Sequence, residues 1–212
     1  LDAREARALR MPRPSAWLAV LIGAPAALVV GQGLAQLAGI FFPVPEAMLE
    51  SFGQFMVDET IPIWQILLYL AIFPGVCEEI AFRGLLLHGL RRRFSPVALA
   101  LAVGLIFGLF HYSLFRIVPT AYLGIVFTAV VLLTGSIYPA MAWHALNNAL
   151  ALVPAHMGWM SSVEEIPGWA YAVAVLGLAA SFTILWRDRT TYPGLRRQRA
   201  EAVATRVEVA AR

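Results

Sequence analysis

The sequence contains no lysine and a single cysteine, and only 14% of its 212 residues are charged. Soluble domains carry closer to a quarter charged residues, so this scarcity argues against a soluble protein. The lone Cys77 excludes an internal disulfide. The net charge of +3 comes from arginines that flank apolar segments, and we expect no nucleic-acid partner.

Apolar residues, by contrast, make up 60% of the chain and are gathered into long runs. One helical crossing of a bilayer needs about 20 apolar residues. The runs cover 16–42, 61–90, 96–112, 117–134, 138–153 and 169–186. They predict an all-α polytopic transmembrane bundle with about six crossings, together with short broken or amphipathic helices, surrounded by membrane lipids.

The charges divide the chain into a basic arm (1–15), a transmembrane domain (16–187) with a motif core at 74–150, and a basic tail (188–212). Arginines near membrane-spanning segments favour the cytoplasmic side, so both ends of the chain and the 91–93 cluster would face the cytoplasm. The acidic connectors at 43–60 and 155–166 would face the opposite side. Arg116 is the exception. We therefore expect an integral membrane protein with both termini in the cytoplasm. The alanine-rich, lysine-free composition favours a bacterial plasma membrane.

Ionisable side chains interrupt the second run, and each such group costs about 2.5–3.5 kcal/mol to insert into a membrane. Glu79 and Arg83 are four residues apart and can pair on one helix face, and one interpretation is that this pair serves only to neutralise both charges. Glu78 is offset by about 100° and needs a partner of its own. Pro74 should loosen the helix one turn earlier, because proline removes a backbone hydrogen bond.

Two histidines occupy other runs. His111 continues a GxxxG face formed by Gly104 and Gly108, which favours close helix packing, but a backbone carbonyl could equally satisfy its ring. His144 and Asn148 share a face of the fifth run. Counted from Pro139, His144 should lie at a shallower depth than Glu78, unless the fourth helix is short and ends inside the membrane. Cys77 acting with His111 is a weaker alternative, and we expect most tryptophans, including Trp143, at the membrane interface.

The segment from Glu78 to Gly84, followed by Phe107 with His111 and by His144 with Asn148, resembles the CPBP family of intramembrane proteases, which includes the CAAX endoproteases and the Abi-type proteins. The family pattern is EExxxR, FxxxH and HxxxN/D on separate helices, in this order. All three elements are present.

The resemblance implies an intramembrane endopeptidase that cleaves a membrane-associated peptide or protein. Glu78 would activate water and His111 would help to hold it. His144 and Asn148 would stabilise the oxyanion, and Glu79 with Arg83 would support the site. Both metal-dependent and glutamate-dependent members have been described. The sequence lacks HExxH, yet Glu78, His111 and His144 could form a three-ligand zinc site.

Two other functions remain open from the residues alone. A non-catalytic membrane scaffold or bacteriocin-immunity protein could keep the same fold without using the carboxylates. A proton-coupled transporter could use Glu78 and His111 as a relay, although no inverted repeat of broken helices is visible.

Overall fold

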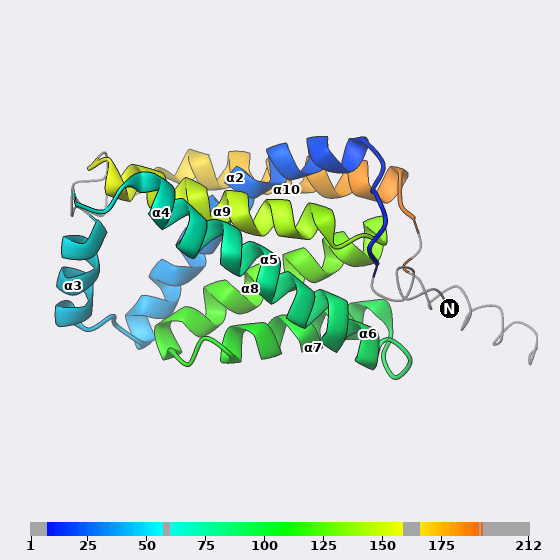
Figure 1. Ribbon diagram of the computed structural model, residues 1–212, viewed down its shortest axis with the longest axis horizontal. Helices are drawn as coiled ribbons and strands as arrows, with labels where there is room; N and C mark the ends of the chain where they lie inside the picture. Colours follow the sequence, from blue (N-terminus) through cyan, green and yellow to red (C-terminus); the bar gives the residue numbers. More distant parts are fainter. Residues whose placement is uncertain (1–7, 57–59, 159–165, 191, 193–212) are drawn as a thin grey trace, which may run out of the picture.

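The computed structural model describes residues 8–56, 60–158, 166–190 and 192. Within these residues every regular element is a helix, in agreement with the predicted all-α class (Figure 1). Several charges used to predict the orientation lie outside the described residues: Arg4, Arg7, Asp58, Glu59, Glu164, Glu165 and the tail from 193 onward.

The helices follow the predicted apolar runs to within a few residues. They are α2 (Ser15–Phe41), α3 (Glu46–Met56), α4 (Ile63–Leu67), the π-helix η1 (Leu68–Ile72), α5 (Phe73–Glu79), the π-helix η2 (Ile80–Leu86), α6 (Leu87–Leu90), α7 (Pro96–Leu109), α8 (Leu114–Thr134), α9 (Tyr138–His156) and α10 (Gly168–Arg187). The elements from α4 to α6 form one continuous helix, Ile63–Leu90. The short α3 lies in the predicted acidic connector, where no individual helix was expected.

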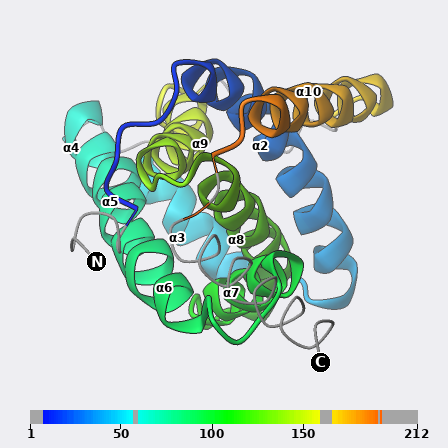
Figure 2. The same cartoon turned by 90° about the vertical axis from the view of Figure 1, so that its right-hand side faces the viewer.

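Long helices lie side by side along the length of the molecule (Figure 1). The α2 helix packs against α10, α7 packs against α8, and α9 contacts α2, α5 and η1. The end-on view shows the same bundle, with the α4–α6 helix on one side and α2 with α10 on the other (Figure 2). The core between them contains Phe107, Phe127 and Trp143, each at most 2% exposed. Trp143 is therefore a core residue, and its predicted interfacial position is wrong.

Four helices in the described part of the chain are long and apolar enough to cross a membrane: α2, Ile63–Leu90, α8 and α10. The α7 helix is apolar but has only 14 residues. The α9 helix has 19 residues but carries His144 and two asparagines, which lower its apolarity. The short helix of the bundle is thus α7. The α8 helix has 21 residues, so a short fourth helix does not account for the depth of His144.

Glycines allow α7 and α8 to approach closely, as the GxxxG face predicted. A Cβ atom added at Gly104 would lie 2.7 Å from the backbone nitrogen of Ile125, and one added at Gly108 would lie 2.7 Å from the Ile117 oxygen. Gly124 on α8 faces Gly104 in the same way, with 2.8 Å between an added Cβ and the Gly104 Cα. Three side-chain-free positions therefore set the distance between the two helices.

Helix ends follow local sequence signals. Ser95 caps α7, because its side-chain oxygen accepts a hydrogen bond from the Ala98 nitrogen at 3.3 Å, and Pro96 occupies the first turn. Gly135 ends α8 in the left-handed conformation (φ 63°), and its N–H donates to the Val131 oxygen. This tight ending allows α9 to begin at Tyr138 and return beside α8.

Candidate active site

The helix that carries Glu78 and Glu79 is irregular on both sides of these residues. The π-helix η1 precedes Pro74, and the π-helix η2 begins directly after Glu79. Proline removes one backbone donor, and π-helical turns occur frequently at functional sites. The predicted loosening near Pro74 is therefore present, and it falls one turn before the two carboxylates.

Glu79 and Arg83 form a fully buried ion pair. The Arg83 Nη1 atom donates to Glu79 Oε1 at 2.7 Å, and both side chains are 0% exposed. The predicted pairing of these two residues is confirmed. Burial of both charges makes the pair costly to break, because either partner alone would be an uncompensated charge.

The remaining donors of Arg83 reach α8. Its Nη2 atom donates to the Gly124 oxygen at 2.7 Å, and its Nε atom donates to Thr128 Oγ1 at 3.3 Å. The Thr128 hydroxyl in turn donates to the Gly124 oxygen at 2.7 Å. Hydrogen bonds to α5 and α8 therefore hold the planar Arg83 guanidinium group on three sides.

His144 lies between the two glutamates. Its Nδ1 atom is 3.0 Å from Glu79 Oε1, and its Nε2 atom is 3.9 Å from Glu78 Oε2. Because an ionised carboxylate only accepts hydrogen bonds, the contact with Glu79 assigns the hydrogen to Nδ1 and turns Nε2 toward Glu78. Sequence reasoning required a separate partner for Glu78, and the structure supplies His144.

The Glu78 side chain is partly buried and partly exposed. Its side chain is 27% exposed, whereas that of Glu79 is 0% exposed. One of its oxygens, Oε2, is nevertheless buried and has no hydrogen-bond partner within the protein. A carboxylate with one unsatisfied inward oxygen and an exposed remainder is well suited to hold a water molecule, because buried polar atoms are normally hydrogen-bonded.

Aromatic rings enclose the charged group. The Phe127 ring stacks on the His144 imidazole with 4.9 Å between centroids and 21° between planes. Phe107 lies edge-on to His144, and the Arg83 guanidinium carbon is 4.6 Å from the centre of the Phe107 ring. These contacts fix the imidazole plane and exclude water from the Arg83 side of the site.

His111 and Asn148 lie at the edge of this group. The His111 Nδ1 atom donates to the Phe107 oxygen at 2.8 Å, which matches the alternative that a backbone carbonyl satisfies this ring. Its ring lies edge-on to that of Phe107, with 5.0 Å between centroids, and Phe107 also contacts His144. Asn148 Nδ2 donates to the Leu70 oxygen at 3.1 Å. Leu70 is four residues before Pro74, so Asn148 supplies the donor that proline lacks.

The predicted zinc ligands do not assemble in this arrangement. Across the described residues, no three His, Cys, Asp or Glu side chains are grouped so that they could hold a metal ion. Glu78 and His144 lie together, but His111 is turned toward the backbone of its own helix. The donor set therefore does not fit the three-ligand site that the sequence allowed.

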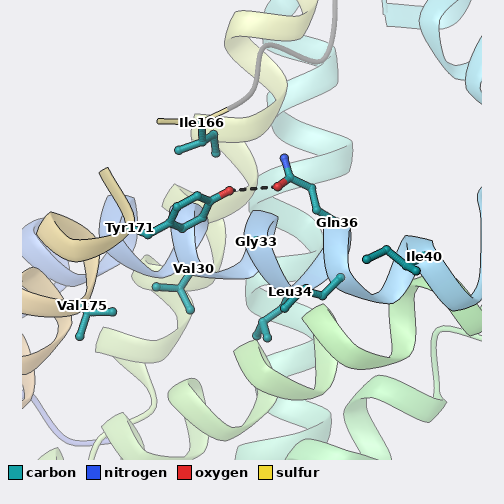
Figure 3. A pocket seen from close by; sticks show the side chains of 9 residues that line it. Val30, Gly33, Leu34, Gln36, Ile40, Ile166, Tyr171 and Val175 are labelled. Atoms are coloured by element: carbon teal, nitrogen blue, oxygen red, sulfur yellow. Dashed lines mark hydrogen bonds between the residues drawn. The ribbon is translucent and has the colours of Figure 1, made fainter. Parts of the chain in front are cut away.

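Two further features are separate from this group. Cys77 is a free, exposed thiol. An apolar pocket of about 840 Å³ lies between α2 and α10, where Tyr171 donates to the Gln36 side-chain oxygen at 3.1 Å (Figure 3). None of the motif residues lines this pocket.

Sequence reasoning missed Gly124, Phe127 and Thr128, which hold Arg83 and His144 from α8. A weak signal was available for Thr128, which is one of three threonines in the apolar run 117–134. Nothing in the sequence indicates that the Gly124 carbonyl accepts from an arginine, because a backbone oxygen has no residue type of its own.

Comparison with known families gives one match. Residues 60–150 match the family model described as type II CAAX prenyl endopeptidase, Rce1-like. The resemblance to the CPBP/CAAX proteases is confirmed over this segment. The matched range contains all seven motif residues and supports a membrane protease in general. No curated protein and no solved structure matched the chain.

The CPBP match covers less than half of the chain, and it includes the helices from α4 to the middle of α9. The long α2 and α10 helices lie outside it. These two helices pack against each other on the side of the bundle opposite α6 and α7 (Figure 2). The motif core therefore occupies one part of the bundle.

Proposed function

We propose that the protein is an intramembrane endopeptidase that hydrolyses a peptide bond of a membrane-associated protein or peptide. The observation that carries this proposal is the placement of His144 between Glu78 and Glu79, with 3.9 Å between its Nε2 atom and Glu78 Oε2. A partly exposed carboxylate beside an oriented imidazole is the pair of groups that general acid–base hydrolysis requires.

In the proposed reaction, Glu78 accepts a proton from a water molecule while the water oxygen forms a bond to the carbonyl carbon. Negative charge then develops on the carbonyl oxygen. When the tetrahedral intermediate collapses, the C–N bond breaks and Glu78 returns the proton to the leaving amine. Glu78 thus acts first as a base and then as an acid, and is regenerated at the end.

His144 and Asn148 are the proposed donors to the developing oxyanion. With Nδ1–H bound to Glu79, a protonated His144 directs Nε2–H into the site, and the Glu79 carboxylate supports the imidazolium. Asn148 uses one N–H on the Leu70 oxygen, and its amide has a second N–H for substrate. Such a donor contributes about 3–4 kcal/mol in a water-poor site. His111 would help to hold the water from the edge of the site.

The proposed mechanism is glutamate-dependent, because the potential metal ligands do not converge. The family description names prenylated CAAX substrates for its members. For this chain we propose that the protease lies in a bacterial plasma membrane with both termini in the cytoplasm. Its role there would be the maturation of peptides or the processing of surface proteins. Its partners would then be membrane lipids and the peptide substrate.

A non-catalytic scaffold or immunity protein of the same fold is the second candidate. The observation that favours it is that several motif side chains have hydrogen-bond partners within the protein: Glu79 Oε1 is bonded to Arg83, His111 to the Phe107 oxygen and Asn148 to the Leu70 oxygen. Glu78 distinguishes the two candidates. Both glutamates have a buried Oε2 atom without a hydrogen-bond partner, but the Glu78 side chain is also 27% exposed whereas that of Glu79 is 0% exposed, and a scaffold has no use for an exposed carboxylate here.

The direct test is to map the termini of membrane and secreted proteins in cells that contain either the wild type or Glu78→Gln. We expect specific new termini with the wild type only. Glu50→Gln, which removes an exposed carboxylate on α3, is the matched control and should give the wild-type pattern. Identical termini in all three strains, or full complementation of a deletion by Glu78→Gln, would favour the scaffold.

A further inference from the structure

The α8 helix contributes no residue of the CPBP motif, yet two adjacent side chains of this helix contact the site. Thr128 accepts a hydrogen bond from Arg83, and Phe127 stacks on His144. Both side chains are 0% exposed. We propose that Thr128 is a positioning residue for hydrolysis, acting through Arg83 and Glu79 on His144. This inference rests on the proposed function.

The Thr128 hydroxyl has a defined direction. Its hydrogen is directed to the Gly124 oxygen at 2.7 Å, so its lone pairs remain to accept the Arg83 Nε–H at 3.3 Å. The same Gly124 oxygen accepts from Arg83 Nη2 at 2.7 Å. One hydroxyl and one carbonyl therefore fix two edges of the guanidinium relative to α8.

The guanidinium position is transmitted to the imidazole through one oxygen atom. Glu79 Oε1 accepts from Arg83 Nη1 at 2.7 Å and from His144 Nδ1 at 3.0 Å. A displacement of Arg83 therefore moves the acceptor that sets the tautomer and orientation of His144. Because Nε2 faces Glu78 from the same ring, the displacement reaches the reacting end of the site.

Loss of the hydroxyl would leave Arg83 Nε buried without an acceptor, and the side chain would have to shift to find another. Misplacement of a catalytic group by about 1 Å can reduce a rate by roughly 100-fold. Thr128→Val keeps the shape and removes the hydroxyl, whereas Thr128→Ser keeps the hydroxyl. Thr120→Val is the matched control, because the Thr120 hydroxyl bonds only to carbonyls of its own helix.

The test uses the full chain in proteoliposomes with a quenched fluorescent farnesylated CAAX-type peptide, together with ¹⁵N NMR of the histidine side chains. We expect Thr128→Val to lower kcat by roughly 10- to 100-fold with little change in KM. The Nδ1–H signature of His144 should also be lost. Thr128→Ser and Thr120→Val should retain both properties. If the valine variant does not fold, Thr128→Ala takes its place, because alanine also lacks the hydroxyl but is smaller. The same loss of kcat and of the His144 signature is expected for it.

The proposal is overturned if Thr128→Val or Thr128→Ala keeps the wild-type kcat and His144 spectrum, or if Thr128→Ser is as impaired as Thr128→Val. The spectrum also separates this proposal from the proposed function. If the wild type cleaves no peptide, the His144 signature alone decides whether Thr128 positions the ring.

Discussion

His144 Nδ1 lies 3.0 Å from Glu79 Oε1, the same oxygen that receives the Arg83 guanidinium. This relationship gives the two neighbouring glutamates different tasks. Glu79 is fully buried and holds two partners, whereas Glu78 is partly exposed and faces the other nitrogen of the ring. A double-glutamate motif can thus combine a structural carboxylate with a reactive one.

The two glutamates should differ in their contribution to stability. Glu79→Gln removes the charge that compensates buried Arg83, and we expect the free energy of unfolding to fall by about 3–5 kcal/mol. Glu78→Gln should change it by less than about 1 kcal/mol, because this side chain is 27% exposed and its charged neighbour is His144 at 3.9 Å, not a buried arginine at hydrogen-bond distance. Equilibrium unfolding in mixed micelles would measure both. Equal losses would contradict the division of tasks.

Close packing of α7 on α8 gives a prediction that is independent of catalysis. Gly104→Ala would place a methyl group 2.7 Å from the Ile125 nitrogen and 3.0 Å from the Ala121 oxygen. Backbone atoms cannot move aside cheaply, so we expect a loss of about 1–3 kcal/mol. Gly39→Ala is the control, because nothing lies within 4 Å of an added Cβ there. A neutral Gly104→Ala would show that the helices are farther apart.

Metal dependence is predicted from the arrangement of donors. Glu78 and His144 lie together, but His111 donates to the Phe107 oxygen and does not join them. We therefore expect 1,10-phenanthroline to leave peptide cleavage unchanged, and elemental analysis of the active protein to find zinc well below one ion per chain. Inhibition that added zinc reverses would contradict this expectation and would require His111 to turn into the site.

Much of the fold could be predicted because membrane-spanning helices have long, readable apolar runs. The predicted run 169–186 became Gly168–Arg187, and the spacing of Glu79 and Arg83 gave their ion pair directly. Contacts within one helix depend on sequence spacing alone, so they can be deduced without a structure.

Contacts between helices were harder to deduce. Counting residues from Pro139 assumes straight helices that start at the same level in the membrane, and it placed His144 at a shallower depth than Glu78. In the structure, His144 Nε2 instead lies 3.9 Å from Glu78 Oε2. The partners of Arg83 on α8 and the contact of Asn148 with the Leu70 oxygen depend on how whole helices pack. Neither leaves a spacing pattern in the sequence.

The most direct test of the account is the rate of peptide cleavage by purified wild type and Glu78→Gln in the same proteoliposomes, with a substrate found by mapping termini. We predict that the glutamine variant folds normally and loses at least about 100-fold in kcat, because the amide cannot take a proton from water. Cleavage by Glu78→Gln at the wild-type rate would contradict the assignment of Glu78 as the base.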